Sequence, residues 1–234
     1  MAKFGLLFAG CIDDLNNHPR YNNDIGFSHS VLEKYAFDDI KVLYSDGRQV
    51  SFSSRTICSE TATYANLEQI LQGYKSVVKP EDTFLMMISN HGGDDGINTW
   101  GDQVMTHGEF VNLLNQITCT KVILLGQCYG GNILSEYVQN CVLISANGPG
   151  HPSYATANRQ YDEFIFHFMS FYNGQYPDGT PLNSSNNQLS INAAFQYAKN
   201  NDTYKNGINL YRYGTIIEVP QISCYDCMPN DIYI

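Results

Sequence analysis

The sequence predicts an α/β fold, a three-layer α/β/α sandwich in which helices cover both faces of a mostly parallel sheet. Three observations predict it. Short apolar runs, typical of strands buried on both faces, alternate with amphipathic stretches at helical spacing. Hydrophobic residues make up 43% of the chain, which is ample for a core. The 234 residues show no internal repeat and no second set of strands, so we expect one domain over residues 1–234.

The predicted strands are the short apolar or β-branched runs. In chain order they are residues 4–9, 39–44, 84–88, 122–125, 142–145 and 214–219. Phe84–Ile88 and Val122–Leu125 are the most hydrophobic of these runs. We therefore place these two strands at the centre of the sheet.

The predicted helices have apolar residues three or four positions apart. They span residues 25–37, 63–74, 108–116, 133–138, 162–172 and 189–199. Because strands alternate with helices, the connections are crossovers and the sheet is mostly parallel. Residues 94–105 are expected to form a polar excursion between the central strands. Residues 173–187, rich in Asn, Gly, Ser and Pro, are predicted to form a mobile loop inside the domain.

The charge balance excludes several classes of partner. Thirteen basic and 23 acidic residues give a net charge of −10, and no run is rich in Lys or Arg. This argues against nucleic acids and anionic membranes as partners. A mean hydropathy of −0.27 excludes an integral membrane protein. Residues 1–10 are followed at once by Asp13 and Asp14, so we interpret them as a buried strand rather than a signal peptide.

The cysteines and acidic residues do not predict a metal or cofactor. Seven cysteines is an odd number, and single cysteines beside apolar runs favour reduced thiols and a cytoplasmic location. Cys224 and Cys227 have C-x-x-C spacing, but no second pair or nearby His completes a zinc set, and we interpret them as a surface pair. Asp94 and Asp95, with Asp102 nearby, are interpreted as a solvated acidic loop rather than a calcium site.

Polar segments that suit acyl transfer follow both central strands. His91-Gly92-Gly93 comes after the first, and Cys128 with its nearby paired glycines comes after the second. Carboxyl ends of parallel strands meet at one edge of a sheet, so we expect His91 and Cys128 to face one crevice. An imidazole that takes the thiol proton makes the cysteine an activated nucleophile. Backbone N–H groups of Cys128 and Gly92 would stabilise the oxyanion.

Four segments of the chain, up to about Gly174, resemble the legumain, or asparaginyl endopeptidase, family of caspase-like cysteine peptidases. They are Phe8-Ala-Gly with Arg20-Tyr-Asn-Asn-Asp24, Ser89-Asn-His-Gly92, Gln127-Cys128, and Ser145-Ala-Asn147 with Pro152-Ser-Tyr-Ala155. The resemblance implies a caspase-like topology. It also implies cleavage of peptide bonds after Asn or Asp, through a Cys128–His91 dyad and a thioester on Cys128.

The resemblance further implies a pocket for the substrate side chain before the cleaved bond. Arg20 is similar in place to an arginine that would clamp the carbonyl or carboxylate of Asn or Asp. Asp162 or Glu163 matches an acid that would accept a hydrogen bond from the Asn amide. The rest of the pocket would be lined by Ser145, Asn147 and Ser153.

Two positions depart from the family pattern. Gly126 stands where the family has an acid, two residues before the nucleophile. The absence of this acid removes the main support for a metacaspase-like preference for Arg or Lys. It also weakens the support for a preference for Asn. The family's orienting Asn has no clear match. His18 lies close to that place, followed by Asn22 and Asn23.

Several alternatives stay open. The same chemistry serves a transpeptidase or ligase, and a metacaspase- or clostripain-like preference for Arg or Lys is the alternative specificity. An alternative without enzymatic activity is a catalytically inactive caspase-like module that binds a partner. A flavodoxin-like nucleotide binder has the same coarse pattern, but only Ala9-Gly10-Cys11 follows the first strand, where a Gly-rich loop is needed.

The expected partner is a peptide or protein substrate, and one such substrate is the chain itself. The Asn-rich residues 183–187 are polar and contain the residue after which a legumain-like enzyme cuts. We therefore predict self-cleavage in this loop.

Overall fold

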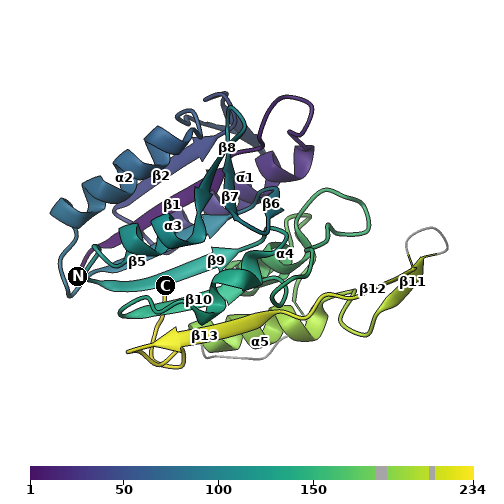
Figure 1. The fold of residues 1–234 in the computed structure, drawn as a ribbon. Helices are drawn as coiled ribbons and strands as arrows, with labels where there is room; N and C mark the ends of the chain where they lie inside the picture. The colour runs from purple at the N-terminus through teal and green to yellow at the C-terminus, as the bar shows by residue number, and fades with distance from the viewer. Residues whose placement is uncertain (183–188, 211–213) are drawn as a thin grey trace.

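A six-stranded sheet forms the centre of the computed structural model, which describes residues 1–182, 189–210 and 214–234 (Figure 1). From one edge to the other its strands are β13 (Gln221–Tyr225), β10 (Cys141–Ser145), β9 (Thr120–Leu125), β5 (Thr83–Ile88), β1 (Lys3–Ala9) and β2 (Asp39–Tyr44). All neighbouring pairs are parallel except β10–β13. The prediction of a mostly parallel α/β sheet is confirmed, and so is the central position of β5 and β9.

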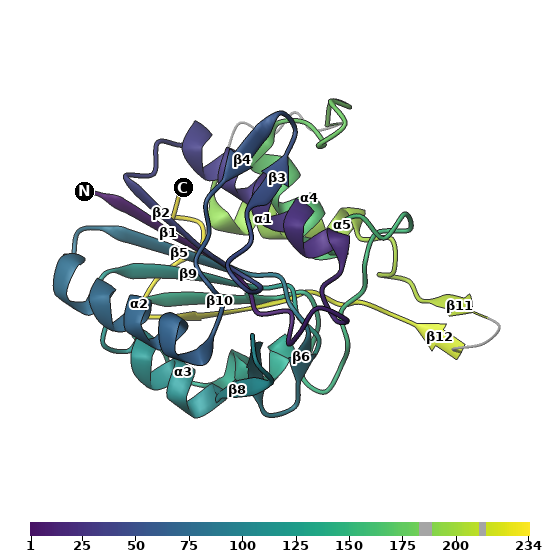
Figure 2. The same cartoon turned by 90° about the horizontal axis from the view of Figure 1, so that it is seen from above.

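Helices cover both faces of the sheet (Figure 2). One face carries α1 (Pro19–Lys34), α4 (Glu163–Asn173) and α5 (Ile191–Asn201), and the other carries α2 (Tyr64–Val77) and α3 (His107–Leu114). Side chains of a strand alternate between the faces. Leu85 and Met87 accordingly join one buried cluster, while Phe84 and Met86 join the other. The fold therefore has three layers.

Helix starts follow ordinary capping chemistry, with one exception. Thr63, Thr106, Asp162 and Ser190 each accept a hydrogen bond from a backbone N–H of the helix that follows. Helix α1 instead starts with Pro19 in its first turn and has no side-chain cap. It begins six residues before the predicted start, because residues 19–24 are mostly polar and show no apolar spacing. Arg20 thus lies in the first turn of α1.

Among the described residues, three small β elements lie outside the central sheet, and only residues 214–216 of them fall in a predicted strand. They are the hairpin β3 (Val50–Phe52) with β4 (Arg55–Ile57), the sheet β6 (Gly92–Gly93), β7 (Gly96–Thr99) and β8 (Gln103–Thr106), and the hairpin β11 (Ile208–Leu210) with β12 (Gly214–Ile216). The sheet β6–β8 occupies the predicted polar excursion. The β11–β12 hairpin extends outward from the body of the protein (Figure 2).

Two predicted elements differ from the structure. The strand expected over residues 214–219 ends at Ile216, and the chain resumes as edge strand β13 after Pro220, which has no N–H to donate to a ladder. A 3-10 helix, η1 (Gly130–Ser135), replaces the helix expected over residues 133–138. Residues 183–187, the predicted self-cleavage region, lie outside the described residues. No helix within the three described ranges is long and apolar enough to cross a membrane.

Candidate active site

The sheet brings His91 and Cys128 to the same edge. Strands β5 and β9 pair in parallel, with Ile88 opposite Leu125. His91 follows Ile88 by three residues, and Cys128 follows Leu125 by three residues. The N–H of Gly126 donates to the carbonyl of Ile88 at 2.8 Å, so the pairing continues one residue beyond the strands. This is the juxtaposition that the two apolar runs predict.

Past the strand ends, the two segments touch through their backbones. A Cβ atom added to Gly92 would overlap the carbonyl oxygen of Cys128 and lie 3.0 Å from its carbonyl carbon. Only a residue without a side chain permits this approach. Gly92, predicted to line the oxyanion site, therefore packs directly against the Cys128 peptide group.

Loop 11–17, the residues that follow β1, holds the His91 ring. Nε2 of His91 lies 2.9 Å from the carbonyl oxygen of Asn16. A carbonyl oxygen only accepts, so Nε2 carries a proton in this contact and Nδ1 is left to take another. His18 and Tyr21 pack edge-on against the ring, with centroid distances of 5.2 and 5.4 Å. Burial lowers the pKa of His91, and the hydrogen bond to Asn16 opposes this shift.

The half-buried Cys128 thiol faces the loop that follows β10. Its Sγ lies 3.7 Å from the carbonyl oxygen of Ser153 and 3.9 Å from the Ser153 hydroxyl. Within the described residues, no hydrogen bond joins Cys128 to His91. Such contacts are often long in a free enzyme and tighten around substrate. The next residue, Tyr129, has a φ of 59°, a strained conformation that its N–H stabilises by donating to the His151 carbonyl at 2.8 Å.

A pocket of about 920 Å³ adjoins this thiol. Ser153, the residue in contact with Cys128, also lines the pocket. The walls come from the start of α1, from the loop that leads to α4, and from the region of the β11–β12 hairpin. Their residues are His18, Pro19, Arg20, Ser153 to Gln160, Tyr204 and Ile216. Arg20 and Ser153, two of the predicted pocket residues, thus line the same pocket, and Ser153 links that pocket to the Cys128 thiol.

Arg20 is mostly buried and is held among aromatic and acidic groups. Its Nη2 donates to the Tyr21 hydroxyl at 2.9 Å, and its guanidinium lies 4.8 Å from the centre of the Tyr21 ring. Burial lowers the pKa of Arg20, but Tyr21 and the nearby carboxyls of Asp162 and Asp24 outweigh it and leave the pKa raised. The guanidinium therefore stays charged in the pocket wall.

The two candidate acids make different contacts. Asp162 caps α4, accepting a hydrogen bond from the Ile165 N–H at 3.0 Å, and lies near Arg20. The Glu163 carboxylate instead accepts hydrogen bonds from His167 at 3.2 Å and from the Thr203 N–H at 2.9 Å. Of the two, Asp162 is therefore the acid beside the arginine.

Asp24 is a site residue that sequence reasoning missed. Its fully buried carboxylate accepts hydrogen bonds from the Ser89 hydroxyl at 2.5 Å and from the Asp162 N–H at 3.1 Å. Burial, followed by the nearby Asp162 charge, raises the pKa of Asp24. Burial also raises the pKa of Asp162, to about 7. The available signal was the spacing from Arg20 to Asp24, one helical turn apart on α1.

The departure at Gly126 has a steric explanation. A Cβ atom added there would lie 2.5 Å from Cδ1 of Ile165 and 3.1 Å from Cγ of Asp162. The space in which an acid at position 126 would begin is therefore filled by α4. Asp162 already brings a carboxyl group to this place.

Ser145 and Asn147 brace the site rather than line the pocket. Ser145 is fully buried, and its hydroxyl accepts a hydrogen bond from the Asn147 N–H at 3.3 Å. The Asn147 side chain is 3% exposed and makes four hydrogen bonds. Its partners are the carbonyls of Pro152 and Ile217 and the N–H groups of Gly148 and Val219. Asn147 thus ties the loop that carries Ser153 to the segment before β13.

Comparison with known proteins assigns no family. Neither a protein-family model nor a curated protein matches the chain. Across the residues that the structure describes, no three His, Cys, Asp or Glu side chains gather in a way that would hold a metal ion. The features of the chain that bear on function are therefore the geometry of its strand ends and the pocket.

Proposed function

We propose that the protein is a cysteine endopeptidase of caspase-like topology that cleaves after Asn or Asp. One observation carries the proposal: the His91-Gly92 and Cys128 segments meet, backbone against backbone, at the carboxyl ends of the two central strands. The adjoining pocket, with the Arg20 charge in its wall, supports the specificity.

The proposed reaction uses Cys128 as nucleophile and His91 as base. Sγ of Cys128 attacks the substrate carbonyl carbon while Nδ1 of His91 takes the thiol proton. The N–H groups of Cys128 and Gly92 stabilise the oxyanion. The tetrahedral intermediate then collapses to a thioester, and His91 gives its proton to the departing amine. Water, deprotonated by His91, attacks the thioester, releases the carboxylic acid and restores the thiol.

Recognition of Asn or Asp is assigned to Arg20, which lines the pocket, and to the buried Asp162 carboxyl near it. Arg20 donates hydrogen bonds to the side-chain oxygen of either residue, an arrangement that suits a planar guanidinium. The Asp162 carboxyl, beside Arg20, accepts from the Asn amide or, when protonated, donates to an Asp carboxylate. A substrate Lys or Arg would instead meet the like charge of Arg20.

Covalent labelling tests the proposal directly. The protein and Cys128→Ala are incubated with acyloxymethyl-ketone peptides that carry Asn, Asp, Arg or Lys before the reactive group, and intact masses are recorded. We expect adducts with the Asn or Asp probe on the wild type alone. Labelling only by the Arg or Lys probes contradicts the specificity. No labelling of a folded protein contradicts the peptidase proposal. Adding an amine to a cleavage reaction then separates hydrolysis from ligation by the products.

A further inference from the structure

We infer that Asn17 positions the His91 imidazole from a distance, by fixing the peptide group that accepts its Nε2–H. The inference rests on the proposed function, in which His91 is the base. No hydrogen bond joins Asn17 to His91 or Cys128 within the described residues. Asn17 is therefore a positioning residue that acts through its neighbour in the chain.

The link from Asn17 to His91 consists of one peptide unit and one hydrogen bond. The carbonyl oxygen of Asn16, which lies 2.9 Å from Nε2 of His91, belongs to the same planar peptide unit as the nitrogen of Asn17. Fixing Asn17 therefore fixes the direction in which this oxygen points. Rotation of that unit would remove the hydrogen-bond acceptor that holds the ring and keeps the proton on Nε2.

Loop 11–17 has hydrogen bonds of its own, from Asn16 to the Asp13 carboxylate at 2.9 and 2.8 Å, but its start is strained. Cys11 and Ile12 have φ values of 61° and 65°. A positive φ is a genuine outlier for a β-branched residue such as Ile12, and it persists only where the surroundings impose it. Gly10 is equally confined, because a Cβ atom there would overlap the Asn98 carbonyl oxygen and lie 2.7 Å from Cα of Thr99. The start of the loop consequently depends on contacts from outside it.

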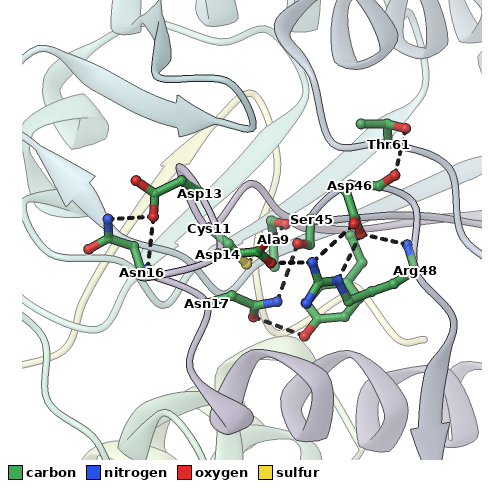
Figure 3. A network of polar contacts seen from close by, with 11 residues as sticks. Ala9, Cys11, Asp13, Asp14, Asn16, Asn17, Ser45, Asp46, Arg48 and Thr61 are labelled. Carbon is green, nitrogen blue, oxygen red and sulfur yellow. Dashed lines mark hydrogen bonds and ion pairs between the residues drawn. The ribbon is translucent and has the colours of Figure 1, made fainter.

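Asn17 supplies the hydrogen bonds on the side of β2. Its Oδ1 accepts from the Tyr44 hydroxyl at 2.9 Å, and its Nδ2 donates to the Ser45 hydroxyl at 3.2 Å. Tyr44 and Ser45 are buried at the end of β2. Arg48 adds ion pairs to Asp14 and Asp46, so that the network ties loop 11–17 to the turn after β2 (Figure 3).

The start of the loop is tied to Asn90, the residue before His91, and to Gly101 in the turn between β7 and β8. The Cys11 N–H donates to Oδ1 of Asn90 at 2.9 Å, and the Gly101 N–H donates to the Ile12 carbonyl at 2.9 Å. Both ties hold the start of the loop. The end of the loop carries the Asn16 carbonyl. From outside the loop it is held by the Asn17 side chain, and within the loop by hydrogen bonds from Asn16 to the Asp13 carboxylate and from the Asn17 N–H to the Asp14 carbonyl. Loss of the Asn17 side chain should therefore loosen the carbonyl, while the hydrogen bonds of Asp13 keep the segment folded.

The electrostatic effect on His91 has a definite sign. The hydrogen bond from His91 to the Asn16 carbonyl raises the pKa of His91 against the lowering effect of burial. The charged and titratable groups that face the ring are Asp13 from the same loop, His18 and Arg20 from the start of α1, and Tyr21. A variant that alters none of these groups, yet releases the Asn16 carbonyl, should lower the pKa of His91 further.

The experiment compares Asn17→Ala, Asn17→Asp and Tyr44→Phe with the wild type. The pKa and tautomer of His91 are measured by NMR titration with 15N-labelled histidine, assigned with His91→Gln. Initial rates with an Asn- or Asp-containing peptide give kcat and KM. Tyr35→Phe is the matched control for Tyr44→Phe. Tyr35 directly follows α1, and the substitution removes a tyrosine hydrogen bond of the same length, 2.9 Å, to the Tyr172 carbonyl.

We expect Asn17→Ala to lower the His91 pKa, to mix the two tautomers, and to reduce kcat by roughly tenfold with KM changed less than about twofold. Tyr44→Phe should act in the same direction but less. Asn17→Asp should retain the wild-type tautomer, because its two oxygens accept from both hydroxyls. Tyr35→Phe should leave the His91 signals unchanged.

Two outcomes overturn the inference. One is a loss of thermal stability in Asn17→Ala with an unchanged His91 pKa and tautomer. The other is an equal response of Tyr35→Phe. Failure of the proposed function is recognised separately, because the NMR readout needs no substrate. A wild type that cleaves no peptide, but whose His91 tautomer depends on Asn17, contradicts the peptidase proposal and leaves the positioning role intact.

Discussion

Gly92 packs against the carbonyl group of Cys128 so closely that no side chain fits between them. The contact joins the loop after β5 to the loop after β9 at the point where the proposed oxyanion donors lie. Gly93, the next residue, has open space where its Cβ atom would stand. Alanine at position 92 would disturb this contact, whereas alanine at position 93 would add only a methyl group. Comparing the two variants therefore separates the effect of the contact from that of the added methyl group.

We predict that Gly92→Ala reduces kcat/KM by roughly a hundredfold or more, which corresponds to about 2.7 kcal/mol of transition-state stabilisation. The added methyl group must push the Cys128 peptide away and so misplaces the nucleophile and its N–H. Steady-state kinetics with an Asn- or Asp-containing peptide checks this. Gly93→Ala is the control and should keep activity within about threefold. Equal losses in the two variants would contradict the role of the close contact.

The pocket arginine gives a second prediction. Arg20→Lys keeps the positive charge beside Asp24 and Asp162 but loses the planar fork. We expect kcat/KM for Asn and Asp substrates to fall by a factor of the order of a hundred, because the hydrogen bonds to the substrate side chain lose their geometry. Peptides that differ only in the residue before the cleaved bond measure the change. Arg159→Gln, which removes a charge from the same pocket, should change it little. A comparable loss in Arg159→Gln would show that general pocket charge, not Arg20, sets specificity.

The sheet and the meeting of the His91 and Cys128 segments could be predicted because their signals are local in sequence. The runs Phe84–Ile88 and Val122–Leu125 are too apolar for any place but the sheet centre, and His91 and Cys128 follow them directly. Edge strand β13 gives no such signal, since its residues are half-buried or exposed and follow a proline. The contact from Asn16 to His91 gives none either, because every residue carries a backbone carbonyl.

Burial decides the roles of the other site residues, and sequence does not report burial. Asn147 looks like a substrate-binding amide, yet its side chain is fully occupied by four backbone groups. Asp24 looks like an ordinary charge on a polar helical turn, yet it lies buried beneath Arg20 and accepts the Asp162 N–H. Both roles depend on segments more than 60 residues away in the chain.

The buried pair Asp24 and Asp162 makes a contribution to stability that falls as pH rises. Burial raises the pKa of Asp162 from 3.8 to about 7, and raises that of Asp24 as well. A carboxyl whose pKa is higher in the folded protein binds its proton more tightly there. Its stabilisation is complete below pH 3.8 and is lost as pH rises towards about 7. Denaturant unfolding at several pH values should show this fall. One pKa unit corresponds to about 1.4 kcal/mol, so the effect is measurable.

Asp24→Asn tests the origin of this dependence. The amide keeps the shape of the side chain and removes one of the two coupled charges, so the free energy of unfolding should vary less between pH 4 and pH 7. Asp178→Asn is the control, because Asp178 is exposed and its pKa is lowered by hydrogen bonds from Thr180. An unchanged pH dependence in Asp24→Asn would assign the fall to other groups, of which Asp202, with a pKa raised to about 6 by burial, is the first to examine.

Gly126 offers the sharpest test of how the pocket obtains its acid. If position 126 merely lacks a carboxylate, Gly126→Asp should restore one and favour basic substrates. The structure predicts otherwise, because a Cβ atom there lies 2.5 Å from Ile165 and close to the Asp162 carboxyl. The variant must displace the start of α4 and place a further negative charge beside Asp162 and Asp24. We expect a loss of a few kcal/mol in the free energy of unfolding and no cleavage after Arg or Lys. Gly126→Ala separates the steric part from the charge. Gain of Arg or Lys cleavage by a stable Gly126→Asp protein would show that α4 yields readily and that Asp162 does not fill this place.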